Sequence, residues 1–228
     1  MIPLKDDTPS TLRPRVTIAL IAACGAAFLW QCSLDDNTSR RAVEALGAIP
    51  AVLLARARLP PDLQWVPRFA TVFTSMFLHG GWMHLLGNML FLWIYGDNVE
   101  DSMGHIRFAA FYLLCGVVAV LAQTLPDPGS PYPIIGASGA ISGVLGAYLM
   151  LFPRAKVLTL VLLPFFFTTL RLPAMLLLLL WFAVQLLSGI AVPDGGASVA
   201  FRAHIGGFLA GVLFVVVMKR RNVPLFAP

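Results

Sequence analysis

The sequence predicts an all-α polytopic membrane protein with six transmembrane helices, on two grounds: its composition and the number of its apolar stretches. Of the 228 residues, 58% are hydrophobic and 12% are charged, and the mean hydropathy is +0.82. A soluble globular chain has about 25% charged residues, so this chain has too few charges to cover a surface in water. The composition disfavours a disordered chain and a nucleic-acid-binding domain. The odd number of cysteines, 3, argues against a secreted disulfide scaffold.

Six apolar stretches are bounded by charged residues, prolines or polar clusters, and each has a length suited to a membrane-spanning helix. They cover residues 16–32, 82–98, 106–125, 136–152, 172–192 and 202–219. We therefore expect a six-helix membrane domain over residues 16–219, between short tails at 1–15 and 220–228.

Two of the connecting segments are themselves apolar. The first loop has about 50 residues, and its middle, from Ala42 to Leu54, is apolar enough to lie at the membrane interface. We expect a long membrane-associated first loop. Residues 157–170 form a second apolar connection. We expect this segment to be interfacial or re-entrant, and a seventh crossing is the alternative.

The distribution of basic residues predicts the orientation. Six crossings place both termini on one side, and that side then holds 10 of the 16 Lys and Arg residues. These are Lys5, Arg13, Arg15, Arg107, Arg154, Lys156, Arg171, Lys219, Arg220 and Arg221. Because basic loops stay in the cytoplasm, both termini are expected there. A seventh crossing would move the basic C-terminal cluster outside, so the rule disfavours it.

Four polar side chains fall inside the predicted spans, where such residues are costly and mark functional sites. They are His84 and Asn88 in the second span, Ser138 in the fourth and His204 in the sixth. Even-numbered helices all begin on the non-cytoplasmic side, and each of these residues lies in the first turns of such a helix. We therefore expect the four side chains to lie at similar depth, near the outer face.

Stripes of small residues predict that the fourth and sixth helices approach each other closely. The helix-packing glycines are Gly139 and Gly143 in the fourth span, and Gly207 and Gly211 in the sixth. If the stripes face each other, Ser138 and His204 come within hydrogen-bonding reach, and His204 can act as general base for a serine nucleophile. The alternative is that both stripes only pack helices.

The surroundings of Ser138 are suited to acyl transfer. Ser138 lies where a loop ends and a helix begins, so its backbone N–H is unpaired and lies in the positive field of the helix terminus. His84 and Asn88 are four residues apart on one helix face, and both can donate to an oxyanion. The alternative is that they bridge to loop carbonyls. Because no carboxylate falls in the spans near His204, a Ser-His dyad is favoured over a triad.

A metal site is not predicted. His79 and His84 are five residues apart, which is off one helical face, and the chain has no His-Glu-x-x-His run.

Three sequence blocks together resemble the rhomboid intramembrane serine proteases. They are His79-Gly-Gly-Trp-Met-His84-Leu-Leu-Gly-Asn88-Met89, Gly136-Ala-Ser138-Gly-Ala-Ile-Ser-Gly143 and Ala203-His204-Ile-Gly-Gly-Phe-Leu-Ala-Gly211. The resemblance covers roughly residues 65–218. It implies Ser138 as nucleophile and His204 as base, with an oxyanion hole formed by the Ser138 amide, His84 and Asn88.

The resemblance also shows where the chain departs from the family pattern. His79 maps to a position that braces the first loop. Many members have a Trp-Arg pair in the first loop, whereas Trp65 and Arg68 are separated here, so no role is carried over to them. Some members have an aromatic residue four positions after the nucleophile, on which the base stacks. Here that residue is Ser142, so either Ser142 or another group must hold His204.

We therefore predict a serine endopeptidase that cleaves transmembrane segments of membrane proteins in a water-accessible cavity opening to the non-cytoplasmic side. Its partners are transmembrane substrates and the lipid bilayer, with no cofactor and no nucleic acid. The expected location is the bacterial inner membrane, with both termini cytoplasmic. The alternatives are a non-catalytic membrane-protein binding or quality-control module and a small-solute transporter, although no internal repeat of the transporter type is visible.

Overall fold

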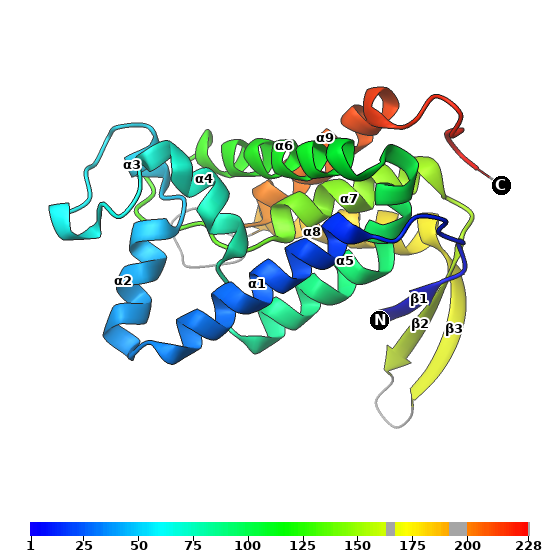
Figure 1. Ribbon diagram of the computed structural model, residues 1–228, viewed down its shortest axis with the longest axis horizontal. Helices are drawn as coiled ribbons and strands as arrows, with labels where there is room; N and C mark the ends of the chain where they lie inside the picture. Colours follow the sequence, from blue (N-terminus) through cyan, green and yellow to red (C-terminus); the bar gives the residue numbers. More distant parts are fainter. Residues whose placement is uncertain (163–166, 192–199, 228) are drawn as a thin grey trace.

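The computed structural model describes residues 1–162, 167–191 and 200–227. Its long helices form one bundle, with the short helices of the first loop at one end and both termini at the other (Figure 1). Six helices occupy the six predicted stretches. They are α1 (Arg15–Ser33), α5 (Trp82–Met103), α6 (His105–Thr124), α7 (Ser138–Leu151), α8 (Ala174–Ala191) and α9 (Phe201–Met218).

The helices differ in how well they fit a bilayer. Among the described residues, four are long and apolar enough to cross a membrane: α1, α6, α8 and α9. Helix α5 has three acidic residues near its end, Asp97, Glu100 and Asp101. Helix α7 is apolar but has only 14 residues. At 1.5 Å per residue this is about 21 Å, against a hydrocarbon core of about 30 Å. The chain is thus a mostly helical membrane protein with four candidate spans, and the count of six stays a prediction.

Helix α7 lies at the centre of the bundle, where it packs against α5, α6 and α9. Its residues from Gly139 to Tyr148 are all buried. Small residues make this possible, because the Gly207 Cα faces the carbonyl group of Gly139, and the Gly211 Cα faces that of Gly143. Helices α7 and α9 therefore touch backbone to backbone, which brings their first turns together.

The first loop folds into short helices rather than an open coil. They are α2 (Asp36–Leu46), α3 (Pro50–Leu53), η1 (Pro61–Leu63), η2 (Arg68–Ala70), α4 (Thr71–Thr74) and η3 (Ser75–Phe77). In the apolar middle of the loop, Ala48 and Leu53 pack with Val120 of α6. Ala48 also exchanges backbone hydrogen bonds of 3.0 and 2.9 Å with Ile134. The loop is thereby tied to the segment that leads into α7, and its membrane association stays a prediction.

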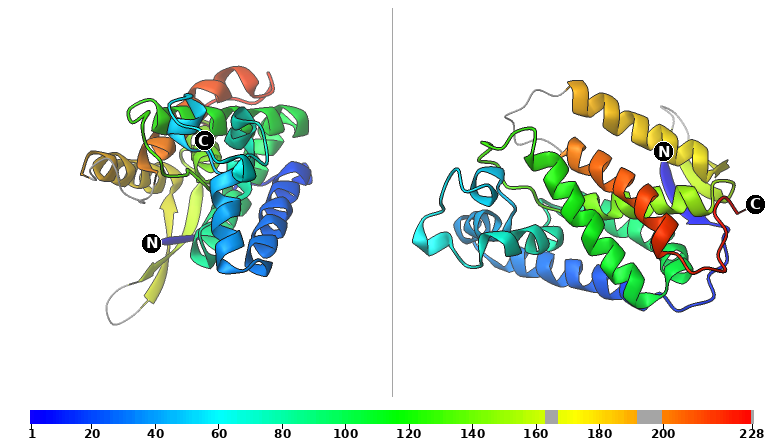
Figure 2. Two further views of the ribbon diagram at one scale, coloured as in Figure 1. Left: turned by 90° about the vertical axis from the view of Figure 1, so that its left-hand side faces the viewer. Right: turned by 90° about the horizontal axis from the view of Figure 1, so that it is seen from above.

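A three-stranded antiparallel sheet was not foreseen from the sequence. Its strands are β1 (Ile2–Asp6), β2 (Lys156–Leu162) and β3 (Phe167–Pro173), in the order β1-β2-β3. The sheet projects from the end of the bundle that carries the termini (Figures 1 and 2). A seventh transmembrane helix over residues 157–170 is therefore wrong, because its described residues pair as strands. Part of that segment, 163–166, lies outside the described residues.

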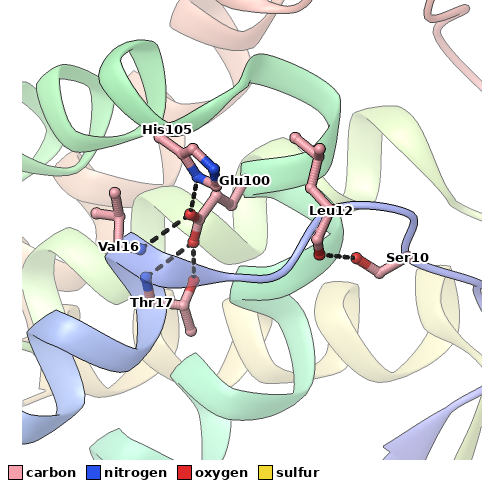
Figure 3. Close-up of polar contacts among 6 residues, drawn as sticks. All are labelled: Ser10, Leu12, Val16, Thr17, Glu100 and His105. Carbon is pink, nitrogen blue, oxygen red and sulfur yellow. Dashed lines mark hydrogen bonds and ion pairs between the residues drawn. The ribbon is translucent and has the colours of Figure 1, made fainter.

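The beginning of α1 is fixed by a carboxylate from another helix (Figure 3). The buried Glu100 accepts from the backbone N–H groups of Val16 and Thr17, at 2.9 and 2.8 Å, and from the Thr17 hydroxyl at 2.7 Å. Its other contact is with His105 Nδ1, at 2.6 Å. The turn from α5 to α6 passes through Gly104 at φ +83°, a value that favours glycine. One side chain thus joins α1, α5 and α6 at the end opposite the first loop.

Candidate active site

Ser138 and His204 meet at the first turns of α7 and α9. His204 Nε2 lies 2.8 Å from Ser138 Oγ, which is hydrogen-bonding distance. The two residues are 66 positions apart in the chain, and the backbone contact between α7 and α9 brings them together. Both helices begin at the end of the bundle that carries the first loop (Figure 1). The pair has the geometry of a nucleophile and its general base.

The backbone N–H of Ser138 is available to a ligand. Ser138 is the first residue of α7, and its N–H has no acceptor among the residues that the structure describes. The loop that leads into the first turn of α7 contains Gly136, whose φ of +115° favours glycine. A Cβ at that position would lie 2.7 Å from His84 Nε2 and 3.7 Å from Ser138 Oγ. Gly136 therefore allows the loop, His84 and the serine to approach one another.

His84 presents a hydrogen-bond donor to the same place. Its Nδ1 accepts the backbone N–H of Gly80 at 3.3 Å, so in the neutral ring the proton is on Nε2. That Nε2 lies beside Gly136, and His84 lines the same cavity as Ser138. His84 can therefore donate to an oxygen bound next to the serine. The alternative role, a bridge to a loop carbonyl, would have to use the same Nε2 proton, because Nδ1 accepts from a loop N–H.

Asn88 supplies a second unused donor. It lies one turn after His84 on α5 and is 8% exposed, and its Nδ2 has no hydrogen-bond partner among the residues that the structure describes. A buried amide without a partner costs free energy, so its retention in a membrane helix needs a reason. An oxygen atom bound in the site would satisfy it.

The four predicted residues share one cavity of about 800 Å³. His84 and Asn88 enter it from α5, Ser138 from α7 and His204 from α9. Apolar groups such as Trp181 and Leu145 line the rest, together with polar groups from the loops. A cavity of this size can admit water and a few residues of an extended peptide. It therefore has room for both reactants of a hydrolysis.

The group that holds His204 was missed in the sequence. Gln185 Oε1, on α8, lies 2.7 Å from His204 Nδ1. Ser142 does not take this role, because its hydroxyl donates to the carbonyl oxygen of Ser138 at 2.6 Å. The aromatic neighbour comes from α8 as well, since the Trp181 ring centre is 6.0 Å from that of His204. The signal for Gln185 was present, because it is a lone amide within the span predicted at 172–192.

His79 lies behind the site and connects the first loop to α1. Its backbone N–H donates to Gln31 Oε1 at 3.0 Å, and its carbonyl oxygen accepts from Gln31 Nε2 at 3.3 Å. Burial lowers the pKa of His79 to about 4, so its ring is neutral and Nδ1 can donate to the Phe77 carbonyl oxygen, 3.2 Å away. These bonds fit the predicted bracing role.

Val43 and Pro50 of the first loop line the cavity, whereas Trp65 and Arg68 make their contacts elsewhere. Trp65 Nε1 donates to the Asp62 carbonyl oxygen at 3.0 Å, and the Arg68 guanidinium lies over the Phe69 ring at 4.7 Å. Neither Trp65 nor Arg68 lines the cavity. Among the described residues, no group of three or more His, Cys, Asp or Glu side chains could hold a metal ion.

Comparison with known proteins assigns most of the chain to one domain type. Residues 66–221 match the rhomboid domain. The chain is 32% identical to RHOMBOID-like protein 5 of Arabidopsis thaliana over 65% of its length and 43% of the relative. It is 34% identical to rhomboid protease GluP of Bacillus subtilis over 60% of the chain and 24% of the relative. It is 33% identical to the mitochondrial rhomboid protein 1 of Saccharomyces cerevisiae over 63% of the chain and 40% of the relative. The chain thus spans less than half the length of each of these relatives.

Proposed function

The chain belongs to the rhomboid family, and from this premise we propose that it is an intramembrane serine endopeptidase that cleaves transmembrane segments of membrane proteins. The observation that carries the proposal is the distance of 2.8 Å between His204 Nε2 and Ser138 Oγ. Family membership alone does not require activity, whereas a serine paired with a histidine in a cavity is what acyl transfer needs.

The proposed reaction begins with attack of Ser138 Oγ on the peptide carbonyl carbon. His204 Nε2 takes the hydroxyl proton and then gives it to the leaving amine, which departs as the acyl-enzyme forms. A water molecule, deprotonated by the same nitrogen, hydrolyses the ester and restores Ser138. In both steps the negative oxygen would accept from the Ser138 N–H, His84 Nε2 and Asn88 Nδ2.

The substrate must be partly unwound before it reacts. A peptide bond in a stable membrane helix is hydrogen-bonded within its own segment and is shielded from attack. Small or helix-breaking residues would let the segment extend into the cavity. Because α7 is shorter than a bilayer is thick, a serine at its first residue would lie below the membrane surface. The cavity would then bring water to that depth.

The proposal includes six crossings, formed by α1, α5, α6, α7, α8 and α9, with both termini in the cytoplasm. The excess of basic residues on the side of the termini supports this orientation. The site would then open to the non-cytoplasmic side. Location in the bacterial inner membrane stays a prediction, since the relatives include plant and mitochondrial proteins.

A fluorophosphonate probe tests the proposal directly, because it reacts with an activated serine. We expect covalent labelling of the purified protein at Ser138, and none in Ser138→Ala or His204→Ala. Ser102→Ala is the matched control, since Ser102 is also a buried serine but bonds to the Asn98 carbonyl oxygen at the far end of α5. An unlabelled wild-type protein that still binds membrane proteins would refute the protease and favour the non-catalytic module.

Cleavage of a reporter with one transmembrane segment tests the oxyanion hole. Asn88→Ala removes one donor, and such a loss lowers kcat by about 10²–10³-fold. Ser138→Ala and His204→Ala should abolish turnover. A Ser138→Ala protein that cut the reporter would disprove the assignment of the nucleophile.

A further inference from the structure

We propose that Gln185 is a positioning residue that fixes the orientation and the tautomer of His204. This inference rests on the proposed serine protease function. Both ring nitrogens of His204 have partners: Nε2 faces Ser138 Oγ at 2.8 Å, and Nδ1 faces Gln185 Oε1 at 2.7 Å. Gln185 is 8% exposed and His204 is 9% exposed, so water does not compete strongly for either bond.

The chemistry of the amide oxygen selects the useful tautomer. A carbonyl oxygen can only accept, so the proton of the neutral ring is on Nδ1. Nε2 then has a free lone pair, which is what a base needs to take the proton of Ser138. With the amide reversed, its NH₂ group would donate to Nδ1, and Nε2 would carry the proton and could not act as base. The bond between Gln185 and His204 thus distinguishes an active ring from an inactive one.

A glutamine suits this location better than a carboxylate. In a Ser-His-Asp triad the aspartate holds the histidine tautomer and stabilises the imidazolium. Here the partner lies on α8, whose residues from Ala174 to Ala191 include no charged side chain. A carboxylate on a membrane helix is costly, whereas a neutral amide can hold the ring at lower cost. The ring is therefore oriented without a negative charge behind it.

Packing between α8 and α9 sets the position of Gln185. The Phe182 and Phe208 rings are stacked with centres 4.5 Å apart. The Trp181 ring, one turn before Gln185, lies beside His204. These contacts fix how far α8 can slide or turn against α9, and they place the amide opposite Nδ1. A shift of α8 would release the base, so α8 controls the reactivity of a serine on α7.

The charged and titratable groups that surround His204 do not take this role. His84 of α5, Arg202 of α9, and Asp127 and Tyr132 of the loop before α7 line the same cavity. Nδ1 of His204 has its bond with the Gln185 side chain. The predicted effects of changing Gln185 therefore act through this bond.

The test measures the rate of fluorophosphonate labelling of Ser138 and the kcat and KM for a transmembrane reporter, each across pH, with the full chain. In Gln185→Leu the ring loses its acceptor, and we expect kcat and the labelling rate to fall about 100-fold with KM little changed. In Gln185→Glu, activity should return, and the acidic limb of the pH profile should move to higher pH by about one unit or more, because a carboxylate favours the charged ring.

Gln31→Leu is the matched control, since Gln31 is also a buried glutamine with two hydrogen bonds, both to the backbone of His79. It can lower the melting temperature but should leave the pH profile in place. A Gln185→Leu protein with wild-type kcat would overturn the proposal. If Gln185→Leu does not fold, an unchanged pH profile in Gln185→Glu would overturn the proposal. Failure of the proposed function is a separate result, because wild-type Ser138 would then not be labelled.

Discussion

The close contact between α7 and α9 makes Gly207 a sensitive test of how packing sets the catalytic geometry. A Cβ added to Gly207 would overlap the carbonyl oxygen of Gly139 and lie 3.0 Å from its carbonyl carbon, whereas ordinary contact begins at 3.4 Å. Both atoms belong to the backbone of α7, so no side-chain rotation can relieve the overlap. In Gly207→Ala the two helices must therefore move apart.

The magnitude follows from where the overlap lies. Gly139 adjoins Ser138, and Gly207 is one turn from His204. Any increase in the distance between α7 and α9 at this point therefore increases the distance between Ser138 and His204 by nearly the same amount. A shift of roughly 1 Å would extend the 2.8 Å bond between them beyond hydrogen-bonding range. A misplacement of that size costs about 10²-fold in rate. Overpacking itself costs about 1–3 kcal/mol of stability.

The assay compares Gly207→Ala with Gly25→Ala. Gly25 lies on α1, where an added Cβ has no heavy atom within 4 Å, so this control changes the same residue type without a clash. We expect Gly207→Ala to lose about 100-fold in kcat/KM and in Ser138 labelling rate, with a lower melting temperature. Gly25→Ala should match the wild type in activity. If the two variants behave alike, the backbone contact does not set the catalytic distance and the reasoning is refuted.

Three further changes probe other parts of the fold. Gly136→Ala combines an unfavourable φ with a Cβ 2.7 Å from His84 Nε2, so reporter cleavage should show a drop in kcat/KM of about 10²–10³-fold. Glu100→Ala leaves buried donors without an acceptor, which should lower the free energy of unfolding by about 3 kcal/mol in a denaturant titration. Burial raises the pKa of Asp6 above 3.8, so the folded state holds this proton more tightly than the unfolded chain. The resulting stabilisation is present in acid and is lost as the pH rises through the raised value. Asp6→Asn should remove this pH dependence from the proteolytic protection of β1, and an unchanged dependence would contradict the assignment.

The helices and the main site residues could be predicted because charged and polar residues are scarce in this chain. In a chain with 12% charged residues, each apolar run has clear limits, and all six predicted runs contain a helix. His84, Asn88, Ser138 and His204 were noticeable for the same reason, and they line one cavity. The lengths were less predictable: α7 begins at Ser138, two residues after the expected start at 136, since Gly136 is in a loop conformation.

The sheet could not be predicted in the same way. The run Val157-Leu-Thr-Leu-Val161 is apolar on both faces, so its pattern does not distinguish a strand from an interfacial helix. Its partner on one side is β1, which is more than 150 residues earlier in the chain by register, with Ile2 opposite Leu160. The N-terminal tail has few apolar residues and gave no strand signal. The pairing of β1 with β2 is non-local, whereas β2 and β3 form a hairpin with Val161 opposite Thr168, and it is this pairing that makes the segments strands.

Gln185 was missed because polar residues near the outer face were sought only in the even-numbered spans. If even-numbered spans begin at the outer face, odd-numbered spans end there. Each of those three ends contains a glutamine: Gln31 in α1, Gln123 in α6 and Gln185 in α8. Gln31 holds the backbone of His79, Gln123 accepts from the Ala203 N–H at 3.2 Å, and Gln185 holds His204. Of these three amides, Gln185 contacts the side chain of the proposed base, whereas Gln31 and Gln123 bond to backbone groups of neighbouring segments. The ring of His204 is thus held by a neutral amide rather than by a buried carboxylate.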